Sequence, residues 1–246
     1  MPDTRRRPPP PAWTQPILAR LTPPVRNLII AITLGYFFFV LAPRAAPFVT
    51  AHLFVGPGLF RGELWQPLTA LFFHDRFTGW FFSVIGLWWV GAFVERTKGP
   101  RFFLALFFGA GVAANVVAAA VSFVLSGGAG EMRSDGAGFA LSATFVAFAR
   151  IYGPRPAQIW GAFSMRADVF TWILIGFSLV IALVNRDGAG FAAELTAIVV
   201  ALGATGGIKD LLALRRRTAR AAQRSRYRVL DGGKRGTSST PPSSLN

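Results

Sequence analysis

The chain has 246 residues, of which 52% are hydrophobic and none is cysteine, and it carries a formal net charge of +15. Its mean hydropathy of +0.45 exceeds what one soluble core of this length needs, so the bilayer is the expected solvent. The absence of cysteine excludes disulfides and thiolate sites, and because the charges lie between apolar runs, the basic balance indicates membrane topology rather than a nucleic-acid partner.

Six apolar runs predict an all-α, polytopic membrane protein with six transmembrane helices. They cover residues 26–43, 79–95, 101–125, 136–152, 169–185 and 189–210. Several approach the roughly 20 residues that a helix needs to cross a hydrocarbon core, whereas the first and the fourth are short. The long, proline-rich leader before the first run disfavours a signal peptide there.

Three segments are expected along the chain. Residues 1–25 should be a disordered, basic and proline-rich tail, 26–212 a membrane domain, and 213–246 a basic tail that becomes rich in Ser and Pro. Most of the 26 Lys and Arg fall in the two tails and in the loops on their side, so the positive-inside rule predicts cytoplasmic termini. The expected location is a prokaryotic inner membrane, with the lipid bilayer as a partner.

Two short motifs flank the start of the second run. Residues 63–74 read Glu-Leu-Trp-Gln-Pro-Leu-Thr-Ala-Leu-Phe-Phe-His, and residues 87–99 read Leu-Trp-Trp-Val-Gly-Ala-Phe-Val-Glu-Arg-Thr-Lys-Gly. In kind and spacing they resemble the rhomboid superfamily of intramembrane serine proteases. The matching positions are Trp65, Thr69, His74, Gly91, Glu95 and Gly99. The resemblance covers about residues 65–201 and implies a rhomboid-like six-helix bundle.

The first outer loop, residues 43–78, is apolar but broken by Pro and Gly, so it should be partly embedded in lipid. The resemblance gives His74 a loop-anchoring role and Glu95 a packing role at the inner end of the second span. Gln66 replaces the Arg of the family's Trp-Arg pair, which removes a five-donor guanidinium that could brace this loop. We therefore expect a less rigid first loop.

Rhomboid proteases use a serine in the fourth span, a histidine in the sixth, and a His and an Asn in the second that help to hold the oxyanion. The serine needs a base to take its proton. Counting from His74, the second-span positions fall on Gly79 and Ser83, and the sixth-span histidine position falls on Glu194. Because the only other histidine is His52, no register supplies the base.

The fourth span can be aligned with the family's nucleophile position in two ways. The favoured one keeps the end of the fourth span at Tyr152-Gly-Pro and puts Gly138 where the serine belongs. The other puts Ser142 there, one helical turn later. A glycine cannot attack a carbonyl, whereas Ser142 would still need a base.

These positions favour a pseudoprotease that binds transmembrane segments of client proteins without cleaving them. Whether the chain is an enzyme stays open, although the missing base argues against it. One alternative is an active intramembrane serine protease that uses Ser142 with an atypical base such as Glu194. Another is a small transporter or channel, for which Asn115 and Glu194 are the intramembrane polar candidates. No cofactor or metal is expected, and the sequence specifies neither the client nor the oligomeric state.

Small residues in the third and sixth runs predict close helix packing. They are Gly109, Gly111, Ala113, Ala114 and residues 118–120 in the third run, and Ala193, Ala197 and Ala201 in the sixth.

Overall fold

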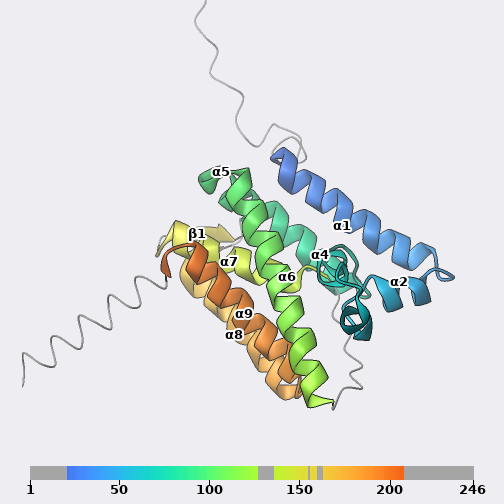
Figure 1. Cartoon of the computed structure of the whole chain (residues 1–246). Helices are drawn as coiled ribbons and strands as arrows, with labels where there is room; N and C mark the ends of the chain where they lie inside the picture. Colours follow the sequence, from blue (N-terminus) through green and yellow to red (C-terminus); the bar gives the residue numbers. More distant parts are fainter. Residues whose placement is uncertain (1–20, 127–135, 155, 160–162, 208–246) are drawn as a thin grey trace, which may run out of the picture. The chain divides into compact units, whose positions relative to one another are not determined.

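The computed structural model describes residues 21–126, 136–154, 156–159 and 163–207 (Figure 1). Residues 1–20 and the whole tail predicted over 213–246 lie outside the described residues. The described part of the chain is helical apart from its loops and one short β-ribbon, so the predicted all-α class is confirmed.

Each of the six predicted apolar runs contains helix. The first, third, fourth, fifth and sixth correspond to α1 (Pro23–Leu41), α6 (Pro100–Leu125), α7 (Gly138–Tyr152), α8 (Ala167–Val184) and α9 (Gly188–Ala204). The second is a composite of α4 (Phe77–Gly86), one π-helical segment η5 (Leu87–Gly91) and α5 (Ala92–Lys98). Four of these helices are long and apolar enough to cross a membrane, while α7 and α9 are apolar but shorter, with 15 and 17 residues.

The helix ends follow local sequence signals. Pro100 opens α6 immediately after Gly99, whose φ of +89° lets the chain turn from the second span into the third. At the start of α9, the Asp187 side chain accepts a hydrogen bond from the backbone N–H of Gly190 at 2.8 Å. These turns explain why adjacent apolar runs fold back as separate helices.

Helix α6 contacts α7 and α9, and α7 in turn contacts α8 and α9 (Figure 1). On α6, Ala110, Ala114 and Ala118 are fully buried at a spacing of four residues. On α9, Ala193, Ala197 and Ala201 are fully buried at the same spacing. Small side chains on both faces let the two backbones approach closely.

The small-residue prediction was wrong for part of α6. Gly109 is exposed, and an added Cβ there would meet no atom within 4 Å. Ala120 is also exposed. Both lie off the stripe through Ala110 and Ala114, because residues share a helix face only at spacings of three or four.

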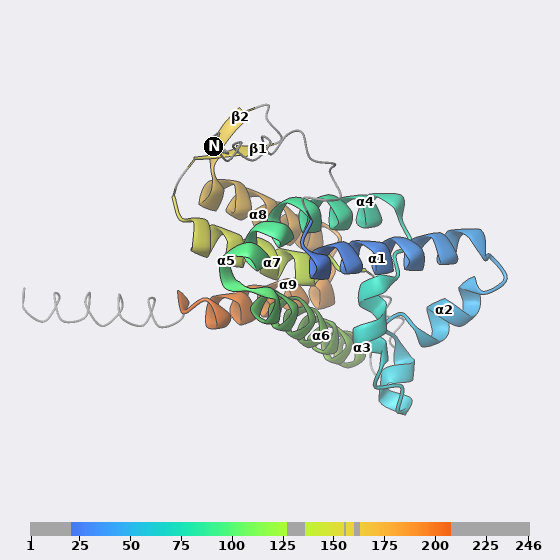
Figure 2. The same ribbon diagram turned by 90° about the horizontal axis from the view of Figure 1, so that it is seen from above.

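The loop between α1 and α4, called the first loop below, contains four short helices: α2 (Ala46–His52), η3 (Pro57–Arg61), α3 (Gln66–Thr69) and η4 (Ala70–Phe72) (Figure 2). Its exposed large apolar side chains are Phe48, Phe60, Leu64, Trp65 and Leu68, and Arg44, Arg61 and Arg76 are exposed as well. Helix α1 contacts α4, η4 and η5, so the first loop begins and ends on neighbouring elements.

Between α7 and α8 the chain forms an antiparallel ribbon of β1 (Pro156–Ile159) and β2 (Phe163–Arg166), with Pro156 opposite Arg166. The sequence analysis placed only a loop here. The ribbon leads directly into α8, where Arg166 and Asp168 form an exposed ion pair of 2.7 Å.

Candidate functional site

His74 lies in the turn between η4 and α4 and is only 2% exposed. Its Nε2 accepts a hydrogen bond from the backbone N–H of Ala137 at 3.2 Å and lies 3.0 Å from the Ser83 hydroxyl oxygen. An Nε2 that accepts from the backbone places the ring proton on Nδ1, which has no partner among the described residues. The imidazole thus joins the first loop, α4 and the start of α7.

The backbone before α7 is shaped around this ring. Gly136 has a φ of +80° and donates its N–H to the Ala70 carbonyl at 2.8 Å. A Cβ at Gly136 would lie 2.6 Å from Nε2 of His74, and one at Gly79 would lie 3.3 Å from Cδ2 of the same ring. The two glycines therefore provide the space that the imidazole occupies.

Burial lowers the pKa of His74 from 6.5 to about 4, although the nearby Asp75 carboxylate opposes part of the shift. The imidazole is therefore neutral at physiological pH. This neutral form suits its role as acceptor for the Ala137 N–H.

Three positions that the family resemblance singled out, His74, Gly79 and Ser83, are thus adjacent in space. Gly79 offers no side-chain donor, and the Ser83 hydroxyl faces His74. The two positions that the resemblance assigns to the oxyanion-binding His and Asn, Gly79 and Ser83, lie here at a hydrogen-bonded joint between elements.

A second polar cluster surrounds Glu194 of α9, which is 3% exposed. The side chains of Ser142 on α7 and Ser178 on α8 lie beside its carboxyl group. Oε1 of Glu194 is buried without a partner among the described residues. Three helices therefore bring two hydroxyls and one carboxyl together in the membrane-spanning part of the bundle.

Gly138 lies one turn before Ser142, at the first residue of α7. It is exposed, and a Cβ added there would meet nothing within 4 Å. Ser142, the nucleophile of the alternative register, is therefore the residue placed beside Glu194. Ser178 was not predicted from the sequence, because it belongs to no motif and is only one of two hydroxyl residues in the fifth apolar run.

The Gly-x-x-x-Glu-x-x-x-Gly motif has a structural explanation at each position. Gly91 is buried and packs closely, because an added Cβ would lie 3.3 Å from Leu87 and 3.4 Å from the Phe103 ring of α6. Glu95 is buried and accepts a hydrogen bond from the Thr22 hydroxyl, which joins α5 to the chain just before α1. Gly99 makes the left-handed turn into α6.

Gln66 is fully buried at the centre of the first loop. Its amide oxygen accepts from the Gly56 N–H at 3.0 Å, and its amide nitrogen donates to the Ala51 carbonyl at 3.1 Å and to Glu63 Oε2 at 2.6 Å. Glu63 Oε1 in turn lies 2.7 Å from His52 Nδ1. We expected a less rigid loop because Gln66 replaces an arginine. The shorter Gln66 side chain instead forms hydrogen bonds with Gly56, Ala51 and Glu63.

Two more side chains tie the first loop together. Trp65 is half exposed and donates its indole N–H to the His52 carbonyl at 2.9 Å. Thr69 donates its hydroxyl to the Leu53 carbonyl at 2.8 Å. From α6, the buried Asn115 donates to the Pro67 carbonyl at 2.9 Å and so attaches α3 to the bundle.

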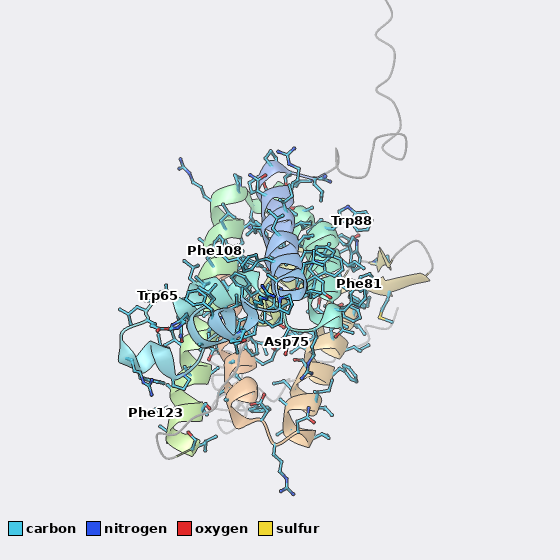
Figure 3. The ribbon with its side chains drawn as sticks, turned by 90° about the vertical axis from the view of Figure 1, so that its right-hand side faces the viewer. Trp65, Asp75, Phe81, Trp88, Phe108 and Phe123 are labelled. Atoms are coloured by element: carbon cyan, nitrogen blue, oxygen red, sulfur yellow. The ribbon has the colours of Figure 1, made fainter. Side chains whose placement is uncertain are left out.

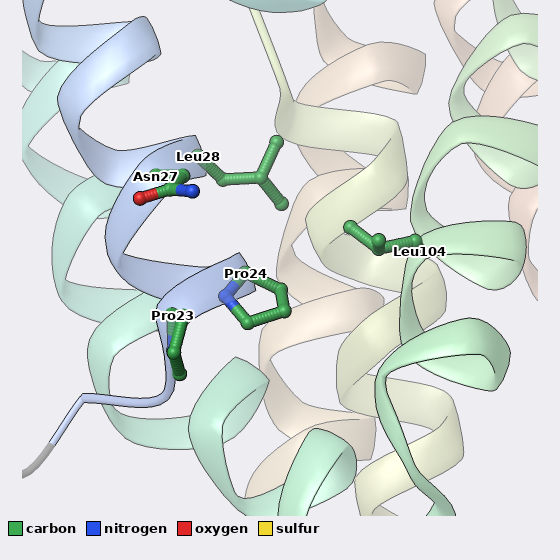
Figure 4. Close-up of a pocket in the computed structure, with 5 residues that line it drawn as sticks. All are labelled: Pro23, Pro24, Asn27, Leu28 and Leu104. Carbon is green, nitrogen blue, oxygen red and sulfur yellow. The ribbon is translucent and has the colours of Figure 1, made fainter.

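A cavity of about 350 Å³ lies between α1 and α6, away from both polar clusters (Figure 4). Its lining residues are Pro23, Pro24, Asn27, Leu28 and Leu104. None of these side chains is a nucleophile or a base, so the cavity offers no reactive group. Among the described residues, no three His, Asp or Glu side chains are grouped so that they could hold a metal ion.

Comparison with known families agrees with this all-helical membrane architecture. The family model described as "Rhomboid domain" matches residues 61–208. The chain belongs to the rhomboid family, and it is an integral membrane protein. A search of curated proteins found no match.

Proposed function

We propose that this rhomboid-family protein binds transmembrane segments of other membrane proteins without cleaving them. The observation that carries the proposal is the carboxyl group of Glu194 at the position of the catalytic histidine. Neither histidine of the chain replaces it, since His74 is hydrogen-bonded to Ala137 and His52 is paired with Glu63 in the first loop.

The chemistry of the cluster supports binding over hydrolysis. A free carboxyl group has a pKa of about 4.3 against about 6.5 for imidazole, so a carboxylate is the weaker base for a serine hydroxyl. The developing oxyanion would also lack side-chain donors, because Gly79 has none and Ser83 faces His74. Both steps of acyl transfer are therefore poorly supported.

The outer faces of α4, η5 and α8 supply apolar area for a client helix. Phe81, Phe82 and Trp88 are exposed on α4 and η5, and Trp172 and Phe177 are exposed on α8. Figure 3 shows Phe81 and Trp88 on the opposite side of the bundle from Trp65 of the first loop. A client segment could therefore pack on this side without displacing the first loop.

The proposed location is a prokaryotic inner membrane with both termini in the cytoplasm. This orientation rests on the distribution of Lys and Arg, most of which fall in the two tails and the loops on their side. It would place the first loop at the outer surface, where its exposed aromatic side chains reach the lipid interface.

A second candidate function, serine hydrolysis, is favoured by one observation. Ser142 lies beside Glu194, which is the arrangement that a nucleophile and its base require. A fluorophosphonate probe separates the two functions, because it reacts covalently with activated serines only.

We expect no labelling of the purified full-length protein. Labelling of the wild type and of Ser178→Ala, but not of Ser142→Ala, would replace the binding proposal with the hydrolase. Ser178→Ala is the matched control, because Ser178 also reaches Glu194 but occupies no nucleophile position.

A further inference from the structure

The Glu194 carboxyl group has a buried acceptor atom that no donor among the described residues uses. Ser142 and Ser178 are within reach of the carboxyl group, yet Oε1 is buried with no partner among the described residues. A buried polar atom without a hydrogen bond destabilises the protein, because it has lost its hydrogen bonds to water. A ligand that supplies the missing donor would therefore gain binding energy at this atom.

The cluster lies close to an open part of the bundle. Gly138 shares a face of α7 with Ser142, one turn earlier, and no atom of the described residues lies within 4 Å of a Cβ built there. Ser142 and Ser178 are themselves only half buried. A side chain that enters beside Gly138 can approach the hydroxyls and then the carboxyl oxygen.

The depth of the site indicates where the donor comes from. Glu194 is the seventh residue of α9, which places it about 9 Å along the axis from the start of the helix. Lipid tails offer no donors at that depth. Polar side chains of transmembrane helices do, and they gain most from pairing because exposure to lipid is costly for them.

We propose that Glu194, Ser142 and Ser178 form a recognition site for a nitrogen-bearing donor side chain, an amide or an ammonium group, in the transmembrane segment of a client. This inference rests on the proposed client-binding function and specifies its chemistry. The carboxyl group accepts the N–H, and the two serine hydroxyls hold the carboxyl in place.

The test uses the full-length protein in lipid nanodiscs and three Leu-rich transmembrane peptides. They carry Lys, Asn or Leu at one position about 9 Å from the end that matches the start of α9. We expect the Lys and Asn peptides to bind about tenfold more tightly than the Leu peptide, which corresponds to about 1.4 kcal/mol. A Lys peptide with the donor at its opposite end should bind like the Leu peptide.

Three variants test whether the cluster of Glu194, Ser142 and Ser178 causes the preference for peptides with a donor side chain. Glu194→Gln keeps an acceptor oxygen and the shape of the side chain, so it should bind the Asn peptide normally but lose the tenfold preference for Lys. Ser178→Ala should weaken both preferences. Thr196→Val is the matched control, because Thr196 lies on α9 and donates to its own helix at Ala192, so both preferences should persist.

The outcomes separate this inference from the function on which it rests. If all three peptides bind the wild type equally, the donor site is refuted while client binding stands. If none binds, both proposals are refuted. A Lys preference that survives in Glu194→Gln and Ser178→Ala would also refute the site, since the donor would then bind elsewhere.

Discussion

At His74, one side chain joins the first loop and α4 to α7, which lies more than 60 residues further along the chain. The ring receives the Ala137 N–H, lies against the Ser83 hydroxyl and occupies the space left by Gly79 and Gly136. The sequence identified His74 from a family motif but assigned it only to the loop. Its link to α7 depends on how η4 meets the start of that helix, which local patterns do not encode.

Gly136→Ala tests this joint. The new Cβ would lie 2.6 Å from His74 Nε2 at a residue whose φ is +80°, so we expect a destabilisation of about 1–3 kcal/mol. The measurement is the free energy of unfolding in detergent. Gly138→Ala is the matched control, because its Cβ meets nothing, and it should change stability by no more than about 0.5 kcal/mol. Equal effects of the two variants would contradict the described joint.

The pH dependence of stability is a second prediction at this residue. The pKa of His74 is lowered to about 4 in the folded protein against 6.5 for the free side chain, so between these values the unfolded chain binds the additional proton. The free energy of unfolding should keep the whole contribution of the neutral His74 above pH 6.5. It should fall by at most about 1.4 kcal/mol per pH unit as the pH is lowered towards 4. In His74→Gln the slope over this range should be smaller, and an unchanged slope would count against a buried neutral imidazole.

Among the elements, the first loop departs most from what its sequence suggested. Its prolines and glycines predicted an irregular segment, yet it contains four short helices around a fully buried Gln66. Each helix is too short to show a periodic pattern, and the bonds of Gln66 reach back as far as Ala51. The apolar runs were easier to predict, because a long stretch without charge has few other structures available in lipid.

Gln66→Leu should loosen this loop. The change removes three hydrogen bonds and leaves the Gly56 N–H, the Ala51 carbonyl and the Glu63 carboxylate without that partner. We expect faster hydrogen–deuterium exchange over residues 51–66 and little change in α6. Leu68→Ala, at an exposed position of the same loop, should leave the exchange unaltered, and similar behaviour of both variants would argue against Gln66 as the brace.

For the whole molecule, the family and the six apolar helices could be predicted from sequence, whereas the relation of α8 to the site could not. Ser178 reaches Glu194 only because α7, α8 and α9 meet in one particular register. The choice between Gly138 and Ser142 likewise depended on a contact between helices that one sequence cannot supply.

The orientation in the membrane gives a prediction at this scale. The chain has no cysteine, so single-cysteine variants need no altered background. In intact cells, a membrane-impermeant maleimide should label Leu64→Cys in the first loop but not Lys98→Cys at the end of α5, both of which are exposed in the fold. Labelling of Lys98→Cys but not of Leu64→Cys would contradict the proposed topology.

The most direct test of the central claim follows the fate of a bound peptide. Full-length protein in liposomes is photo-crosslinked to a Lys-bearing transmembrane peptide, and mass spectrometry then reports the captured and the free peptide. A binding protein without the catalytic base should capture the peptide and leave all of it intact. Cleavage by the wild type that disappears in Ser142→Ala would contradict the account, because it would make the Ser142–Glu194 pair catalytic.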